Sequence, residues 1–397
     1  MRLLLINNVA RYLNGGANRV VVETVEGFHR RGLEVGCIYH SQQSELSPDI
    51  WTRKVDSLQS IGNVRPQLLS AISDFRPDII QSHSAEVVPL YSDWVPHYPS
   101  CQYVHDESWH CSGGNRVSRN LVHCQRPHGA ACLAWHVVKG CGGRSPVGNF
   151  RRWLQVQGRT ASLRFRQLRI QVASQFMKRG FLENGYPSDR IDVIPLYSAA
   201  PIAAAPTEPG LVVLPSRLVH HKGVRVLIEA LNLIKDVPWR LVVPGDGPDK
   251  PALEALIQKL GLSGRVSLPG ELHPQVVAGW YARAQLVAFP VLREEPYGLV
   301  GVEALAYGKP IVAFAGGAVD EWLWPGETGL KVSEKSAFAL ASALRDLLRD
   351  PQRCETMGAA ARRRYPQFTL DAYLDRLLVS LESVQSGFVK SSVSSSD

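Results

Sequence analysis

Apolar residues recur along this chain in two alternating patterns, short continuous runs and longer stretches at helical spacing. The run from Leu3 to Ile6 is uninterrupted, as expected for a strand buried on both faces of a parallel sheet. Apolar residues at helical spacing from Val21 to Phe28 follow, and Gly32 ends this helix before a second strand over 33–39. The chain therefore opens with a predicted strand-helix-strand unit.

The same alternation continues in two blocks. The predicted strands that follow cover 78–80, 101–104 and 169–173 in the first block, and 211–214, 240–243, 266–268, 286–289 and 311–314 in the second. The predicted helices of the second block cover 224–234, 250–260, 275–284 and 299–307. This alternation predicts an α/β protein with two doubly wound, Rossmann-like domains, whose ligands bind at the carboxyl ends of the strands and in the cleft between the domains.

A stretch rich in Pro and Ala over 186–205 is the expected linker between the two domains. We place an amino-terminal domain at 1–195 and a carboxyl-terminal domain at 196–365 of the 397 residues. A last helix at 366–385, with its leucines at helical spacing over 370–384, is predicted to pack back toward the amino-terminal domain. The serine-rich tail over 386–397 is predicted to be disordered.

Charge is distributed very unevenly along the chain. The net charge is +8, yet the segment from Ser108 to Leu182 contains thirteen Lys and Arg and no acidic residue, which leaves 31 basic and 36 acidic residues elsewhere. Such a segment suits nucleic acid, an anionic membrane surface or a phosphorylated substrate, or is a solvated face without a partner. No signal peptide or membrane-spanning run is evident, so we expect a cytoplasmic protein.

Two glutamates, Glu295 and Glu303, flank Gly298 at the start of a predicted helix. A helix amino terminus attracts anions, and carboxylates accept hydrogen bonds from sugar or ribose hydroxyls. Arg217 and Lys222 lie just after the first strand of the second domain, and such a pair neutralises a pyrophosphate without a metal. Taken separately, the two glutamates are equally compatible with a solvated helix, and a bare pair of cations on a loop is more often simply exposed at the surface.

Taken together and in order, these motifs resemble the GT4 family of retaining glycosyltransferases, which have the GT-B fold. The resemblance is carried by Gly15-Gly16, His105-Asp106, the segment from Arg217 to Gly223, the segment from Gly245 to Pro248, and the segment from Glu295 to Pro310. It covers most of the chain and is densest over 211–332. Pro215 in place of a usual glycine, and Val319-Asp320-Glu321 after a double glycine, depart from the family pattern.

The resemblance implies a role for each matching residue. Arg217 and Lys222 would hold the donor diphosphate, Glu303 the ribose hydroxyls, and Glu295 the transferred sugar. Backbone groups of Tyr297, Gly298 and Leu299 would contact the phosphate and sugar, His105 would lie near the reacting carbon, and Gly15 and Gly16 would let the backbone approach the donor. We assign catalytic roles to His105 and Glu295.

The resemblance also implies a reaction that retains the anomeric configuration, in which the leaving phosphate helps to deprotonate the acceptor. Arg217, Lys222 and the helix start at Gly298 would stabilise the charge on the leaving group. No catalytic metal is expected. We expect a UDP- or GDP-linked hexose as donor and a glycan or lipid-linked acceptor, in the synthesis of cell-surface polysaccharide or glycolipid.

The sequence argues against one other class of protein and leaves a second as an alternative. A dinucleotide oxidoreductase is excluded because the first turn is Gly15-Gly16 rather than G-x-G-x-x-G, and the second strand ends at Tyr39-His40 without an acidic residue for a ribose. A catalytically silent GT-B protein that binds an anionic polymer remains the alternative. The complete set of site residues favours the enzyme.

A cysteine-rich basic insertion at about 108–165 follows His105. Its thiols, Cys111, Cys124, Cys132 and Cys141, suffice for a structural zinc but lack paired C-x₂-C spacing, so zinc, disulfides and free thiols all stay open. From Arg144 to Arg179, nine basic residues alternate with aromatic and aliphatic ones, which favours a phosphate-bearing acceptor or an anionic bilayer. We expect peripheral association with the inner face of a membrane, and no nucleic-acid binding because no such module accompanies the charge.

Overall fold

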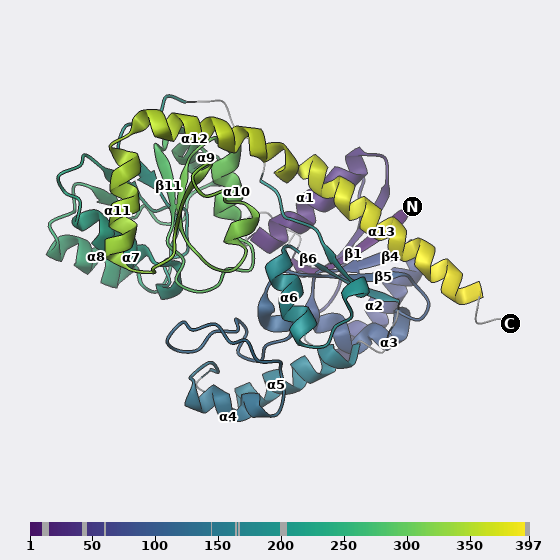
Figure 1. Cartoon of the computed structure of the whole chain (residues 1–397). Coiled ribbons are helices and arrows are strands. Elements are labelled where there is room, and N and C mark those ends of the chain that lie inside the picture. The colour runs from purple at the N-terminus through teal and green to yellow at the C-terminus, as the bar shows by residue number, and fades with distance from the viewer. Residues whose placement is uncertain are drawn as a thin grey trace. The chain divides into compact units, whose positions relative to one another are not determined.

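The computed structural model describes residues 1–9, 16–41, 46–58, 61–143, 145–162, 165, 167–198 and 205–393 (Figure 1). They divide into two compact units. Unit 1 comprises Met1–Leu196 with Leu370–Asp397, and unit 2 comprises Tyr197–Thr369. Each unit is built on one parallel sheet with helices in most of the connections between its strands, so the predicted class of two Rossmann-like units is confirmed.

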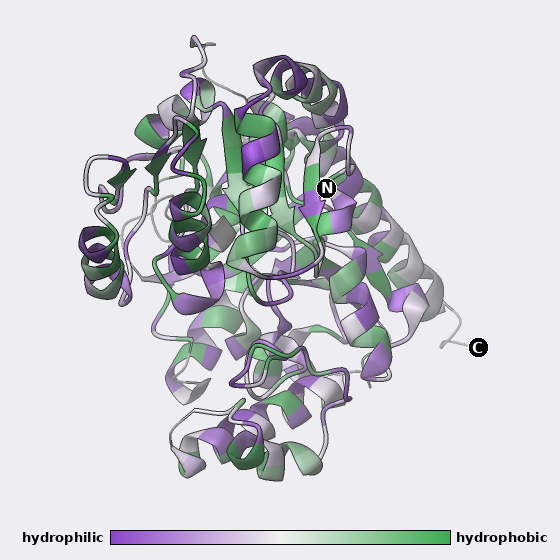
Figure 2. Ribbon diagram, turned by 60° about the vertical axis from the view of Figure 1, so that its left-hand side comes forward, coloured by the Kyte–Doolittle hydropathy of each residue, from purple (hydrophilic) through white to green (hydrophobic). Residues whose placement is uncertain are grey.

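The sheet of unit 1 has seven strands in the order β3-β2-β1-β4-β5-β6-β7. Their bounds are β1 Arg2–Val9, β2 Glu34–Ser41, β3 Trp51–Lys54, β4 Ile79–Ser82, β5 Ser100–Val104, β6 Leu168–Val172 and β7 Ile191–Val193. The continuous apolar pattern of β1 reflects its central place, because Leu3, Leu4 and Leu5 are fully buried. Figure 2 shows the strands coloured mainly as hydrophobic, whereas the helices carry both kinds of residue.

Helices and short 3₁₀ segments connect these strands. They are α1 Gly16–Arg30, α2 Ile61–Phe75, η1 Ala85–Leu90, α3 Tyr91–Trp94, η2 Glu107–Trp109, α4 Ala131–Val138, α5 Pro146–Ala161, α6 Gln175–Glu183 and η4 Ser188–Arg190. α4 and α5 belong to the predicted insertion, which occupies the long connection between β5 and β6. The carboxyl ends of β4 and β5 are neighbours in this sheet, with Ser82 paired to Gln102. Residues that follow these two strands are therefore brought together.

The last helix, α13 Leu370–Val393, packs on unit 1 beside α1, as predicted (Figure 1). Gly27 of α1 allows a close approach, since a Cβ there would lie 2.5 Å from Leu374 Cδ1. Arg31 pairs with Asp371 at 2.8 Å and with Asp375 at 2.7 Å. The helix runs to Val393, so the prediction of a disordered tail was wrong for 386–393; 394–397 lie outside the described residues.

The sheet of unit 2 has six strands in the order β10-β9-β8-β11-β12-β13. Their bounds are β8 Leu211–Val213, β9 Arg240–Val242, β10 Val266–Ser267, β11 Leu286–Phe289, β12 Ile311–Phe314 and β13 Gly329–Val332. The helices are η5 His220–Lys222, α7 Val224–Asn232, α8 Lys250–Lys259, α9 Pro274–Arg283, α10 Leu299–Ala306, η6 Val319–Glu321, α11 Ala337–Leu348, α12 Pro351–Arg364 and η7 Tyr365–Phe368. The strands and helices predicted for this block are confirmed.

Three strands escaped prediction, and each has a physical reason. β3 is an edge strand whose residues Thr52 to Lys54 are exposed, so it lacks an apolar run. β7 has only three residues and lies inside the segment predicted as a linker. β13 begins at Gly329, whose Cβ would lie 2.1 Å from Ile311 O of the neighbouring strand. Within the described part of the chain, no helix is long and apolar enough to cross a membrane.

Candidate functional site

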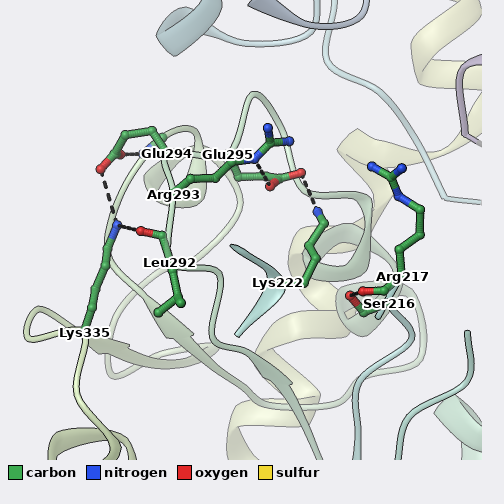
Figure 3. Close-up of polar contacts among 9 residues, drawn as sticks. Ser216, Arg217, Lys222, Leu292, Arg293, Glu294, Glu295 and Lys335 are labelled. Atoms are coloured by element: carbon green, nitrogen blue, oxygen red, sulfur yellow. Dashed lines mark hydrogen bonds and ion pairs between the residues drawn. The ribbon is translucent and has the colours of Figure 1, made fainter. Parts of the chain in front are cut away.

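The loop after β8 carries the predicted basic pair. Arg217 is exposed, and Lys222 ends the short segment η5 just before α7. Figure 3 shows the two side chains extending in the same direction from this loop. Gly223 turns the chain with φ 73°, in a place where a Cβ would lie 1.9 Å from Pro290 O. Only glycine combines this conformation with this contact, so the backbone fixes where Lys222 points.

Lys222 is bound directly to one of the predicted glutamates. Its Nζ donates to Glu295 Oε1 at 2.9 Å, and Arg293 Nε lies 3.7 Å from Glu295 Oε2 (Figure 3). The three side chains are only 13% to 16% exposed. Two cations thus surround one carboxylate in a sheltered place, which leaves a net positive charge beside the loop. Such a cluster suits an anionic ligand and has a carboxylate for its hydroxyl groups.

Glu294, the neighbour of Glu295, has different partners. Its carboxylate accepts the backbone N–H of Gly317 and lies 3.4 Å from Lys335 Nζ, which also donates to Leu292 O at 3.0 Å (Figure 3). These contacts anchor the loop between β11 and α10. Glu294 therefore holds the loop in place, and Glu295 is the glutamate that lies with the cations.

A buried tryptophan packs against the amino terminus of α10 and hydrogen-bonds to the turn before it. Trp322 Nε1 donates to Tyr297 O at 2.6 Å, and Gly298 caps the helix with φ 95°. A Cβ at Gly301 would lie 2.3 Å from the Trp322 ring, so only the absence of a side chain lets the first turn of the helix pack directly against the indole. Leu299 is the first residue of α10. The backbone of this turn is thereby fixed at a helix end that favours negative charge.

Glu303 lies one turn further along α10. Its Oε2 accepts a hydrogen bond from Tyr281 OH at 2.6 Å, and the Tyr281 ring stacks on Tyr307 with centroids 5.4 Å apart. This arrangement fixes one oxygen of the carboxylate. Unit 2 thus holds five predicted features, Arg217, Lys222, Glu295, the turn at Tyr297 to Leu299, and Glu303, on the two connections that follow β8 and β11.

His221, the neighbour of Lys222, is an uncharged member of this cluster. Burial, together with the charges of Arg293 and Lys222, lowers the pKa of His221 to about 4. The imidazole is therefore neutral at pH 7 and adds no positive charge to the site. Its backbone oxygen accepts the N–H of Leu292 at 2.8 Å, which ties the two functional loops together.

In unit 1, His105 follows β5 and lies against a second histidine. His105 Nε2 is 3.0 Å from His83 Nδ1, and His83 follows the neighbouring strand β4. Burial lowers the pKa of His105 to about 4, although Asp106 acts in the opposite direction. His105 is thus a neutral imidazole at pH 7. Gly16 begins α1, whereas Gly15 lies outside the described residues.

The insertion has a surface unlike that of the rest of the chain. Six of its large apolar side chains are exposed, although basic residues surround them: Val122, Val137, Val138, Val147, Phe150 and Leu154. Arg126 lies 4.4 Å and Lys139 lies 5.1 Å from the centroid of the Trp135 ring. Cations over aromatic rings beside exposed apolar groups give this surface both charge and apolar area.

The four cysteines of the insertion line one cavity of about 700 Å³, which His110, His123, His128 and His136 also line. Burial, together with the neighbouring Cys111, Cys124 and Cys132, raises the pKa of Cys141. Cys111 Sγ accepts the backbone N–H of Arg116 at 3.3 Å. Among the described residues, however, no three His, Cys, Asp or Glu side chains are arranged to hold a metal ion.

Several residues of the site were not predicted from the sequence. Arg293 and Tyr281 contact the predicted glutamates, Trp322 supports the helix start, and His83 contacts His105. Nothing in their local sequence distinguishes them. The one available signal was position, because His83 directly follows a buried strand, as His105 does.

The arrangement of two Rossmann-like units, with basic residues and carboxylates on the connections that follow β8 and β11, is that of the GT-B class. The fold is similar to that of a sucrose-phosphate synthase from Thermosynechococcus elongatus, with a TM-score of 0.74 and 20% identity over 97% of this chain and 99% of that one. At this identity the similarity concerns the fold.

Sequence comparison identifies the family. Residues 14–196 match the model of Glycosyltransferase Family 4, and residues 200–364 match that of Glycosyl transferases group 1. Together the two matches cover most of the chain, which belongs to this family of glycosyltransferases, as the motifs predicted.

Two relatives illustrate the range of the family. A GDP-mannose-dependent alpha-(1-6)-phosphatidylinositol monomannoside mannosyltransferase from Mycolicibacterium smegmatis is 35% identical over 38% of this chain, and the match spans 42% of that protein. A D-inositol 3-phosphate glycosyltransferase from Nocardia farcinica is 28% identical over 87% of this chain and 80% of its own length.

Proposed function

We propose that this protein is a retaining glycosyltransferase that moves a hexose-type sugar from a UDP- or GDP-linked donor to a glycan or lipid-linked acceptor. Its place would be in the synthesis of cell-surface polysaccharide or glycolipid. The observation that carries the proposal is the cluster of Lys222, Arg293 and Glu295 beside the fixed start of α10. It offers positive charge for a diphosphate and a carboxylate for a sugar within one sheltered region.

The proposed donor contacts all lie in unit 2. Arg217 and Lys222 bind the diphosphate, and the backbone at Tyr297 to Leu299 contacts phosphate and sugar. Glu303, held by Tyr281, accepts hydrogen bonds from the ribose hydroxyls, and Glu295 from those of the sugar. The name of the mycobacterial relative, with GDP-mannose as donor, supports a donor of this kind.

The reaction breaks the bond between the anomeric carbon and the diphosphate oxygen and forms one to the acceptor oxygen on the same face of the sugar. The acceptor hydroxyl passes its proton to an oxygen of the leaving phosphate. Lys222, Arg217 and the start of α10 stabilise the negative charge that develops on the leaving group. These protein cations do the work that a divalent metal does elsewhere, so we propose that catalysis needs no metal.

The acceptor would bind in unit 1. A cavity of about 770 Å³ lies between η1 and α5, with apolar walls from Leu58, Val88 and Leu154. Glu86 and Arg159 also line it, and Arg159 is fixed because its Nη1 donates to Ser108 O at 2.5 Å. One acidic and one basic group within apolar walls suit an acceptor that has both a phosphate or hydroxyl groups and a hydrocarbon part. The names of both relatives contain an inositol phosphate, which supports such an acceptor.

We also propose that the insertion places the protein on an anionic membrane surface. Phe150 is 47% and Leu154 is 49% exposed on α5, and Arg151 and Arg152 lie between them. The test is sedimentation with vesicles of phosphatidylcholine alone or mixed with phosphatidylglycerol. Wild type should sediment only with the anionic vesicles, and the double variant Phe150→Ser/Leu154→Ser should stay in solution. Phe338→Ser, which removes a side chain 77% exposed in unit 2, is the control. Equal sedimentation with both vesicle types contradicts the proposal.

The four cysteines of the insertion are proposed as ligands of a structural zinc. In the described residues between 110 and 155 no apolar side chain is buried, so a metal cross-link would add the stability that an apolar core supplies elsewhere. The thiols surround one cavity, and a backbone N–H already points at Cys111 Sγ. Because no three ligands are preset for an ion, the side chains must turn inward on binding. Plasma mass spectrometry of freshly purified protein should give one zinc per chain, and much less than one overturns the proposal.

The reaction itself is tested by following a UDP- or GDP-sugar and its product by NMR. Wild type should consume the donor and give a product of unchanged anomeric configuration. Glu303→Ala should weaken donor binding and turnover together, whereas Glu229→Ala, on the surface of α7, should change neither. Unchanged turnover in Glu303→Ala would show that the donor binds elsewhere.

A further inference from the structure

The pairing of His83 with His105 follows from the register of β4 and β5. Ser82 is paired with Gln102, so the next residues, His83 and Tyr103, lie side by side, and their rings stack at 5.3 Å with an interplanar angle of 9°. His105, two residues after Tyr103, lies on the same face of the strand, and its ring stacks on His83 at 5.2 Å. The two imidazoles are thereby held in one orientation at 3.0 Å.

The surroundings keep both rings uncharged. Burial and the proximity of His105 lower the pKa of His83 well below its ordinary value, and burial lowers that of His105 to about 4. Asp106 acts against burial by raising the pKa of His105, and its carboxylate accepts the N–H of Ser108 at 2.8 Å. The other titratable groups packed here are Tyr103, which donates to Ile194 O at 2.9 Å, and Tyr373 of α13, 6.5 Å from Tyr103. Two neutral imidazoles at 3.0 Å must share a single proton between their facing nitrogens.

The position of that proton follows from the other nitrogen of His83. His83 Nε2 is buried and has no hydrogen-bond partner in the described part of the chain. A buried N–H without an acceptor is rarer in proteins than an acceptor without a donor. The favourable arrangement therefore has the proton on His83 Nδ1, which donates to His105 Nε2. His105 Nε2 is then occupied as an acceptor, and the proton of His105 is on Nδ1.

We propose that His83 is a positioning residue that holds His105 as a neutral imidazole with its proton on Nδ1. His105 then serves the donor sugar as a hydrogen-bond donor and has no basic nitrogen available for the acceptor hydroxyl. The inference rests on the proposed function of His105. It explains why the proton of the acceptor has to pass to the leaving phosphate.

The experiment uses the full chain with ¹⁵N-labelled histidine, and it combines NMR with donor kinetics. The variants are His83→Leu, which removes the hydrogen bond, and His83→Asn, whose amide nitrogen takes the place of Nδ1. His97→Asn, at an exposed histidine of the same unit, is the control. Wild type and His83→Asn should show His105 in the Nδ1–H form, whereas His83→Leu should show both tautomers.

In kinetics, His83→Leu should lower kcat about tenfold with an unchanged KM for the donor, and His83→Asn should recover most of the loss. An Nε2–H form of His105 in wild type, or an unchanged tautomer and kcat in His83→Leu, overturns the inference. A changed tautomer together with full turnover in His105→Ala would leave the positioning intact and contradict the proposed role of His105 in the reaction.

Discussion

The proposed donor side of unit 2 and the insertion of unit 1 differ in what is buried within them. In unit 2, the functional loops follow buried strands, and the core beneath them includes Leu214, Leu218 and Leu227, all at most 1% exposed. In the insertion, the described residues between 110 and 155 bury no apolar side chain, and their buried groups are polar, such as Arg116 and His136. The proposed donor site is built on an apolar core, whereas the insertion, proposed to face the membrane and its acceptor, has no such core in its described residues.

Two glycines after β9 allow close packing against the loop that carries Arg217. A Cβ at Gly245 would lie 2.0 Å from Ser216 O, and one at Gly247 would lie 2.3 Å from Leu218 O. The segment after β9 thus presses on the loop that carries Arg217. The segment from Gly245 to Pro248 therefore supports the basic loop.

The largest effect is expected from Lys222→Ala. This change removes the cation that pairs with Glu295 and faces the leaving diphosphate, so turnover should fall about 10²-fold or more. Arg225→Ala, three residues along and 47% exposed on α7, is the matched control and should retain wild-type turnover. Donor consumption is the measurement. If both variants lose activity equally, the effect is one of net charge and not of the site.

Gly245→Ala should have the next largest effect. Its φ of 136° and the contact with Ser216 O forbid a Cβ, so the Arg217 loop must move. We expect a rise of about tenfold in KM for the donor and a loss of roughly 1–3 kcal/mol in unfolding free energy. Gly279→Ala, in α9 with open space around it, should be slightly stabilising. Urea unfolding with donor kinetics distinguishes the two, and an unaffected Gly245→Ala would contradict the packing account.

Removing the proposed zinc should loosen the insertion and leave the donor site unchanged. After chelation, trypsin should cut within 110–155, where Arg119, Arg126 and Lys139 are exposed, while donor binding changes by less than about twofold. Mass spectrometry of the fragments with calorimetric donor titration measures both. Loss of donor binding at the same chelator concentration would show that the regions are not independent.

The smallest effect concerns pH. Because the pKa of His105 is lowered to about 4, this group stays neutral above that value and is protonated only as the pH falls through it. The value of kcat/KM for the donor should therefore not vary between about pH 6 and pH 8 on account of His105. A decline of activity with an apparent pKa near 6.5 that disappears in His105→Gln would contradict this.

Sequence patterns predicted the layers of both units because buried parallel strands such as β1 and β11 are short, continuous apolar runs. They missed β3 because an exposed edge strand has no such run. They placed α13 correctly but ended it too early, since its final turns have a serine-rich sequence with little apolar periodicity.

In the candidate site, too, some residues could be predicted from the sequence and others could not. Lys222, Glu295 and Glu303 lie in local motifs and were predicted. Their partners, Arg293, Tyr281 and Trp322, were not, because such contacts depend on tertiary packing that single-sequence patterns do not contain.

The central claim is that unit 2 binds a nucleoside diphosphate sugar through Lys222. The most direct test is thermal unfolding of wild type, Lys222→Ala and Arg225→Ala with UDP-, GDP- and ADP-sugars, because a bound ligand raises Tm by mass action. Our account predicts that a UDP- or GDP-sugar raises the Tm of wild type and Arg225→Ala but not that of Lys222→Ala. An equal rise in Lys222→Ala, or no rise in wild type with any of these donors, would contradict it.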